Sequence, residues 1–126
     1  TEDSLRNRQH YLKMNGREIF KVAVRLMERA SRKLLEKHGL TPADIACVIP
    51  HQANARIVES LAQRMELPID RFFCNLDRYG NTSAASIPIA LNEACDEWNF
   101  SHGDYILMVS FGAGLTWSSG LLRWTI

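Results

Sequence analysis

Residues 45–49, Ile-Ala-Cys-Val-Ile, form a continuous apolar run that ends at Pro50. A strand with one face in water alternates polar and apolar residues, whereas a strand of a parallel sheet is covered on both faces and is apolar throughout. Proline has no backbone N–H to donate, so it marks the point where strand pairing stops. The run therefore predicts a buried strand of a parallel sheet, which needs other elements to cover both of its faces.

Helical patterns lie on either side of this strand. In residues 17–38 apolar side chains recur at intervals of three and four, as in an amphipathic helix, and Gly39 is suited to end it. Residues 41–44, Thr-Pro-Ala-Asp, have the composition of a short capped turn. We expect a second helix from about 54 to 65 and a third from shortly after Asn81 to about Trp98.

Two further segments and a glycine-rich turn complete the predicted sheet. Residues 72–74, Phe-Phe-Cys, are short, but their place between two helices favours a strand. Residues 105–111 are apolar and β-prone, residues 112–114 turn the chain, and residues 115–126 can return antiparallel. This order predicts an α/β fold in which helices alternate with strands, with a mostly parallel sheet and a terminal antiparallel hairpin.

The length of 126 residues predicts a single domain, 1–126. Residues 1–15 are mostly polar, so we expect a loop or a strand remnant of a preceding region there. The formal net charge of +1 provides no overall field that would attract nucleic acid or a membrane. No apolar run approaches the roughly 18 residues of a membrane span. We therefore expect a protein that binds neither nucleic acid nor membrane.

The three cysteines, Cys47, Cys74 and Cys95, are an odd number without Cys-x-x-Cys spacing. This pattern is typical of a reduced, cytoplasmic protein and predicts neither a disulfide framework nor a metal site. None of the three lies at a strand-to-helix elbow, where the pKa of a thiol would be lowered. We interpret them as structural residues and not as nucleophiles.

Polar or loop residues follow each predicted strand at its carboxyl end, where ligand sites of parallel sheets lie. His51 follows the first strand directly, Asn81 follows the second, and Phe111 with its glycine-rich turn follows the third. An imidazole and a carboxamide can both donate hydrogen bonds to one oxygen and so stabilise an oxyanion or an enolate. Two alternatives stay open: His51 could act as a general base, and Asn81 could be a helix N-cap.

Basic side chains gather on one side of the predicted helix over residues 17–38, and Glu28 and Glu36 offset them only in part. They are Arg17, Lys21, Arg25, Arg29 and Arg32. The stripe alone fits either a solvated face or a surface that docks an acidic partner.

Four segments together resemble the C-terminal half of β-ketoacyl-acyl carrier protein synthase III, a thiolase-fold condensing enzyme. They are residues 14–24, 50–54 (Pro-His-Gln-Ala-Asn), 76–86 (with Gly-Asn-Thr-Ser) and 110–117. The resemblance implies an acyltransferase of fatty acid synthesis that joins an acyl-CoA primer to malonyl-acyl carrier protein by decarboxylative Claisen condensation. It implies a cytoplasmic homodimer that needs no cofactor.

This family uses a Cys-His-Asn triad, and the resemblance assigns the histidine to His51 and the asparagine to Asn81. Phe111 matches a phenylalanine beside the triad. The backbone N–H of Ala113 matches an oxyanion-hole donor at a position where the family usually has glycine.

The resemblance also implies binding residues. Gly16 and Asn54 match positions that line the pantetheine channel. Lys21 and Arg56 match basic residues that bind the acyl carrier protein, and Arg64 lies in the same basic region. These matches favour the docking interpretation of the basic stripe.

The family's nucleophilic cysteine belongs to the N-terminal half, which this chain does not contain. We therefore expect the chain alone to be inactive in condensation and to expose apolar surface. Two alternatives stay open. One is a non-catalytic thiolase-fold scaffold or carrier-protein-binding domain, and the other is a related acyltransferase of secondary metabolism.

Overall fold

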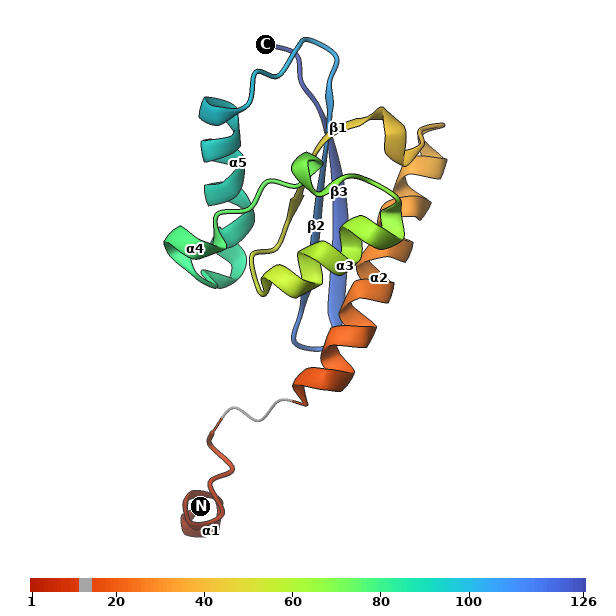
Figure 1. The fold of residues 1–126 in the computed structure, drawn as a ribbon. Helices are drawn as coiled ribbons and strands as arrows, with labels where there is room; N and C mark the ends of the chain where they lie inside the picture. The colour runs from red at the N-terminus through yellow and green to blue at the C-terminus, as the bar shows by residue number, and fades with distance from the viewer. Residues whose placement is uncertain (12–14) are drawn as a thin grey trace.

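The computed structural model of the chain describes residues 1–11 and 15–126. Five helices and three strands are described, with helical stretches before and after β1 and a strand pair at the end (Figure 1). They are α1 (Glu2–Arg6), α2 (Gly16–Lys37), β1 (Ile45–Pro50), α3 (Ala55–Met65), α4 (Leu76–Tyr79), α5 (Ser86–Glu97), β2 (Tyr105–Gly112) and β3 (Thr116–Arg123). Single 3-10 turns span Pro42–Asp44, Ile69–Arg71 and Ser83–Ala85. The alternation confirms the predicted α/β class.

The three strands form one sheet in the order β1-β2-β3. β1 runs parallel to β2, with Pro50 opposite Val109, and β2 runs antiparallel to β3, with Gly112 opposite Thr116. The predicted terminal hairpin is therefore confirmed.

The predicted strand at residues 72–74 is wrong. The segment makes one isolated parallel bridge between Phe72 and Val48, and the N–H of Phe73 donates to the Val48 carbonyl at 2.9 Å. A 3-10 turn ends at Arg71 and α4 begins at Leu76, which leaves too few residues for a ladder. Both phenylalanines are buried, in the two different core clusters, so packing rather than strand pairing explains their apolar character.

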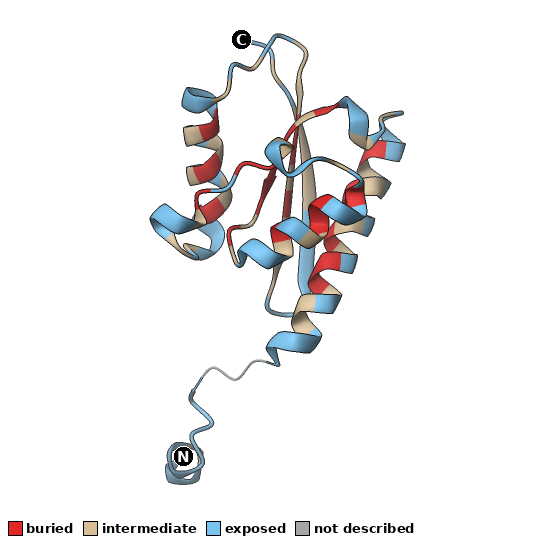
Figure 2. Cartoon of the chain, viewed as in Figure 1, coloured by how far each residue is buried: buried red, intermediate tan, exposed pale blue. Residues whose placement is uncertain are grey.

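Helices cover both faces of β1, as its composition predicts. Val48 packs into the cluster formed with α2 and α3, whereas Cys47 and Ile49 pack into the cluster formed with α5. The buried residues accordingly gather on β1 and on the sides of the helices that face the sheet (Figure 2).

Both ends of α2 are capped, and the cap at its C-terminal end is the one predicted from the sequence. At its start the Asn15 side chain accepts a hydrogen bond from the N–H of Glu18 at 3.4 Å. At its end Gly39 has φ of +68°, which a glycine adopts without strain. The capped turn at 41–44 is confirmed, because the Asp44 carboxylate accepts from the N–H and the hydroxyl of Thr41, both at 2.7 Å.

A loop or strand remnant was expected over residues 1–15, and α1 lies in the described part of this region. The Thr1 hydroxyl caps this short helix by accepting from the N–H of Ser4 at 3.2 Å, and Glu2 pairs with Arg6 at 3.3 Å. These local polar contacts form a helical turn without any buried residue. Met14, one residue of the 14–24 motif, lies outside the described residues. No described helix is long and apolar enough to cross a membrane.

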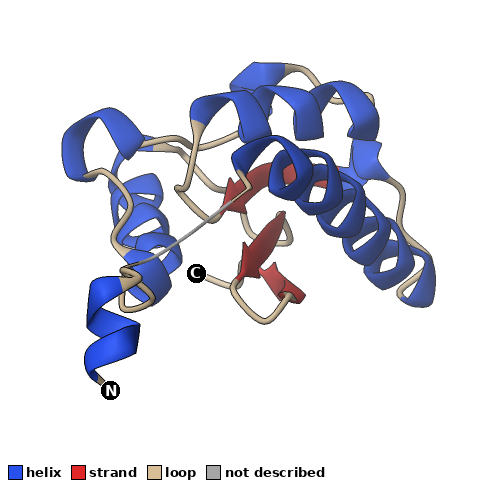
Figure 3. Cartoon of the chain, turned by 90° about the horizontal axis from the view of Figure 1, so that it is seen from below, coloured by secondary structure: helices blue, strands red, loops and turns tan. Residues whose placement is uncertain are grey.

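Four segments lie at the end of the sheet where β1 and β2 finish. They are the start of α2, the loop after β1, the connection between α4 and α5, and the turn between β2 and β3 (Figure 1). Figure 3 views the molecule from this side, with helices to the left of the strands and above them. The segments that carry the predicted site residues therefore lie at one end of the fold.

Ser31 offers a test of the packing between α2 and the sheet. It is fully buried, yet its hydroxyl has no hydrogen-bond partner among the described residues. An unpaired buried hydroxyl costs about 1–3 kcal/mol, and alanine has the higher helix propensity. We expect Ser31→Ala to raise the free energy of unfolding by about 1 kcal/mol in urea denaturation. The exposed Ser118→Ala is the control with little effect, and a lower stability of Ser31→Ala would contradict the packing described.

Candidate active site

His51 is held where the sheet meets α5. Its N–H donates to the carbonyl of Val109 at 2.8 Å, so the backbone stays bound to β2 one residue beyond β1. Its ring atom Nδ1 lies 2.5 Å from the hydroxyl oxygen of Ser86, the first residue of α5. Ser86 is buried and His51 is half-buried. The ring is therefore bound through Nδ1, and Nε2 is the nitrogen left for a ligand.

The environment of His51 favours the neutral imidazole. Burial lowers the pKa of His51 from its ordinary value, because desolvation disfavours the charged form. The ring also contacts the first residue of α5, where the helix dipole is positive and disfavours a second proton. A neutral imidazole carries one N–H and can donate one hydrogen bond.

Asn81 follows Gly80, which ends α4 with φ of +67°. Its Oδ1 accepts a hydrogen bond from the N–H of Ser83 at 3.0 Å, and its side chain is exposed. This contact stabilises the left-handed backbone of Ser83, φ +53°, and leaves the Asn81 NH2 group available as a donor. Asn81 is not the N-cap of α5, since that helix begins at Ser86 and has no side-chain cap.

A buried polar network that sequence analysis missed connects the loop after β1 to the start of α4. The Gln52 amide donates to the carbonyls of Pro50 at 2.9 Å and Phe73 at 3.2 Å, and its oxygen accepts from the N–H of Asn75 at 3.2 Å. Gln52 and Asn75 are each about 1% exposed. The only signal in the sequence was the position of Gln52, a polar residue directly after His51 at the end of an apolar strand.

Glu93 on α5 extends this network to α4. Its carboxylate accepts from the Tyr79 hydroxyl at 2.5 Å and from the Asn75 amide at 2.8 Å, and it pairs with Arg78 at 2.9 Å. The hydrogen bonds from Tyr79 and Asn75, together with the charge of Arg78, lower the pKa of Glu93. These contacts bind α4 to α5, and the Asn81 loop is the connection between the two helices.

Phe111 and Ala113 lie at the far end of β2. Phe111 is half-buried, opposite Trp117 of β3, and packs against the core cluster beneath α2 and α3. Ala113 is exposed in the turn and is not among the residues with positive φ, so alanine fits here. Gly114 has φ of +140°, and a Cβ there would lie 2.9 Å from the side chain of Thr116. Among the three turn residues 112–114, Gly114 is therefore the one position that requires glycine.

Gly16 and Asn54 are exposed helix-start residues at the same end of the fold. Gly16 begins α2. Asn54 is the N-cap of α3, and its Oδ1 accepts from the N–H of Arg56 at 2.9 Å. Helix capping by itself accounts for an asparagine at position 54. The NH2 group of Asn54 is not used by the cap and stays available to a ligand.

The basic residues of α2 and α3 differ in how far they are neutralised. Glu28 pairs with Arg32 at 2.8 Å and with Arg64 at 3.4 Å, and Arg32 also donates to the Arg64 carbonyl at 2.6 Å. Lys21 and Arg56 are exposed and form no ion pair within the described residues. Their charge therefore remains available to an acidic partner.

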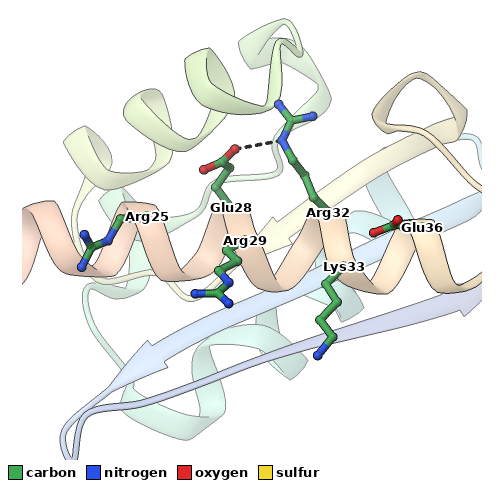
Figure 4. A pocket seen from close by; sticks show the side chains of 6 residues that line it. All are labelled: Arg25, Glu28, Arg29, Arg32, Lys33 and Glu36. Carbon is green, nitrogen blue, oxygen red and sulfur yellow. Dashed lines mark hydrogen bonds and ion pairs between the residues drawn. The ribbon is translucent and has the colours of Figure 1, made fainter.

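A surface depression lies along α2 beside these pairs (Figure 4). It is lined by four basic and two acidic side chains: Arg25, Glu28, Arg29, Arg32, Lys33 and Glu36. Its three arginines, Arg25, Arg29 and Arg32, belong to the basic stripe predicted from the sequence.

The thiols of Cys47 and Cys74 are not activated. Cys47 is fully buried, and desolvation raises its pKa to about 12. Burial, reinforced by Asp77 and Glu59, also raises the pKa of Cys74. Within the described ranges no cluster of His, Cys, Asp and Glu could hold a metal ion. Among the groups at this end of the fold, His51 and Asn81 therefore offer hydrogen-bond donors, and neither Cys47 nor Cys74 offers an activated thiol.

The network around Gln52 yields a prediction on stability. Gln52→Ala would leave two carbonyls and one N–H unpaired in the interior and would create a cavity. We expect it to lower the free energy of unfolding by about 3 kcal/mol, measured by urea denaturation. Gln63→Ala, at an exposed position of α3, is the matched control with a change below about 0.5 kcal/mol. Equal effects of the two changes would contradict the role assigned to the network.

The chain is similar to known proteins in both sequence and fold. The family model described as 3-Oxoacyl-[acyl-carrier-protein (ACP)] synthase III C terminal matches residues 35–124. The beta-ketoacyl-acyl-carrier-protein synthase III of Roseiflexus sp. strain RS-1 is 55% identical over 125 residues, which are 99% of this chain and 38% of that protein. The chain therefore spans little more than a third of the length of that curated relative.

Solved structures show the same fold. The 3-oxoacyl-acyl-carrier-protein synthase III of Aquifex aeolicus VF5 has a TM-score of 0.87 at 54% identity, covering 90% of this chain and 37% of that one. The corresponding enzyme of Pseudomonas aeruginosa PAO1 has a TM-score of 0.87 at 39% identity, covering 92% and 37%. Family match, sequence identity and fold agree, and the chain belongs to the family of 3-oxoacyl-acyl-carrier-protein synthase III C-terminal domains.

Proposed function

We propose that this chain supplies the two side-chain N–H donors of a 3-oxoacyl-acyl-carrier-protein synthase III. The enzyme joins an acyl-CoA primer to malonyl-acyl carrier protein and needs no cofactor. The proposal rests on which atoms of the two side chains are already hydrogen-bonded within the protein. Asn81 has its oxygen bound to Ser83, and His51 has Nδ1 bound to Ser86, so each offers nitrogen atoms to a ligand at the same end of the sheet.

The two donors would act in the decarboxylation of the malonyl group. The bond between the α-carbon and the carboxylate breaks, CO2 leaves, and the electron pair moves through the α-carbon to the thioester oxygen as an enolate. His51, through Nε2–H, and Asn81, through its NH2 group, donate to that oxygen. A neutral imidazole suits this role, since it stabilises the charge without transferring a proton.

Condensation then uses a second oxyanion site. The α-carbon of the enolate attacks the carbonyl carbon of an acyl group held as a thioester on a cysteine. The resulting oxyanion accepts a hydrogen bond from the N–H of Ala113, and it collapses to the ketone as the thiolate leaves. In this proposal the cysteine comes from the N-terminal half of the enzyme, because the Cys47 and Cys74 thiols are not activated.

Three further residues are proposed to bind the substrate. Gly16 and Asn54 lie at helix starts at this end of the fold and would line the pantetheine path, with the Asn54 NH2 group as a donor. Phe111, half-buried at the end of β2, would close the apolar side of the site. The family also favours a cytoplasmic homodimer.

Acyl carrier protein is the proposed macromolecular partner. Lys21 and Arg56 are exposed and unneutralised among the described residues, and Arg64 is shared with Glu28. We therefore assign the attraction of the acidic carrier mainly to Lys21 and Arg56, with Arg64 in a supporting position. Such charges raise the association rate more than the affinity.

The donor roles of His51 and Asn81 can be tested in a chimera that joins this chain to the N-terminal part of the Roseiflexus sp. relative. We expect His51→Ala and Asn81→Ala each to lower the rate of malonyl-acyl carrier protein decarboxylation by about 100-fold or more. The double variant should lose little beyond that, because the two groups act on one oxygen. Release of CO2 measures the rate.

Two exposed residues of the same types serve as controls, His102→Ala and Asn99→Ala, which should leave the rate unchanged. Unchanged rates in His51→Ala and Asn81→Ala would refute the catalytic role and favour a scaffold that only binds the carrier.

Docking of the carrier protein predicts a salt-dependent effect. In the same chimera we expect Lys21→Glu and Arg56→Glu to lower kcat/KM for malonyl-acyl carrier protein roughly tenfold at low ionic strength, with kcat little changed. The loss should shrink as salt is added. Lys37→Glu, at the opposite end of α2 from Lys21, is the control. Equal losses in all three variants would point to net charge and contradict a local docking surface.

A further inference from the structure

Ser86 is a buried residue whose side chain contacts the proposed catalytic histidine. It is 2% exposed, and its hydroxyl oxygen lies 2.5 Å from Nδ1 of His51. We propose that Ser86 is a positioning residue that donates its hydroxyl proton to Nδ1 and so places the ring proton of His51 on Nε2. The inference rests on the proposed function, since it concerns the N–H that His51 would offer to the enolate.

The position of the ring proton decides whether His51 can act. A neutral imidazole has one N–H and one acceptor nitrogen, and the hydrogen bond at one nitrogen fixes the role of the other. If Ser86 accepted from Nδ1–H, Nε2 would carry a lone pair and would repel an enolate oxygen. If Ser86 donates, Nε2 carries the hydrogen and binds that oxygen.

Two features of the structure favour donation by Ser86. First, Nδ1 of His51 is the sole side-chain partner of the Ser86 hydroxyl in the described part of the chain, so the reverse arrangement would leave a buried O–H without an acceptor. Second, Ser86 is the first residue of α5, and the positive end of a helix disfavours a further N–H pointing toward it. Both effects favour the Nε2–H tautomer.

The hydroxyl is also held in a rigid position. α5 packs against β1 through Ala90 and Ala94, which are fully buried beside Cys47 and Ile49. The backbone of His51 is bound to β2 through Val109. Donor and acceptor therefore belong to elements fixed by the same core, and the tautomer is set before a substrate binds.

Nitrogen NMR of the 126-residue chain, labelled with 15N in its histidines, reads the tautomer directly. We expect the Nε2–H form for His51 in the wild type and a mixture of the two forms in Ser86→Ala. Ser86→Thr, which keeps a hydroxyl, should restore the Nε2–H form. Ser31→Ala, which also removes a buried hydroxyl, is the matched control and should leave the His51 signals unchanged. An Nδ1–H form in the wild type, or an unchanged tautomer in Ser86→Ala, would overturn the proposal.

Kinetics of the chimera provide a second measurement that does not require the isolated chain to fold. We expect Ser86→Ala to lower kcat for decarboxylation about tenfold without raising KM, and Ser86→Thr to recover most of the loss. Loss of activity in His51→Ala with full activity in Ser86→Ala would refute only the role of Ser86. Full activity in both would refute the proposed function itself.

Discussion

The parallel pairing of β1 with β2 is the interaction on which both the fold and the candidate site depend. β1 is buried on both faces, with Val48 in one core cluster and Cys47 and Ile49 in the other. A shift of one residue would exchange these faces, so the two clusters hold the register. Hydrogen bonding continues past the strand to His51, whose N–H donates to Val109 at 2.8 Å. The hydrophobic core therefore determines where the imidazole lies.

Polar contacts position the loops that do not pair with the sheet. Gln52 joins the loop after β1 to the segment before α4, and Glu93 binds α4 to α5. Buried polar groups cost free energy unless they are paired, so a network with every member satisfied allows few alternative arrangements. The loops that carry His51 and Asn81 are connected in this way although neither belongs to a strand.

The protein uses charge differently at the candidate site and on the surface of α2 and α3. At the site, burial lowers the pKa of His51, and the donor groups are neutral. On α2 and α3, Glu28 neutralises Arg32 and Arg64 in part, whereas Lys21 and Arg56 stay exposed. In the proposed enzyme the neutral donors stabilise a charge that forms only during the reaction, and the exposed cations act while the partner approaches.

Local sequence signals were enough to predict α2, β1, α3, α5 and the β2-β3 hairpin in the right order, with His51 and Asn81 at the ends of elements, but they missed α1 and α4. Apolar periodicity, caps and turn residues are local properties, and they placed α2, α3 and β1 within one residue and the terminal hairpin within three. The apolar pattern gave a wrong strand at Phe72 and Phe73. A buried aromatic pair gives the same sequence pattern whether it lies in a paired strand or packs into the core from a loop.

Which polar groups contact each other depends on how the whole chain packs. Ser86 lies 35 residues from His51, and Asn75 lies 23 residues from Gln52. Such contacts form because the core brings distant helix starts and strand ends together. A local pattern carries no information on that distance, so the partner of each buried polar group had to be found in the folded chain.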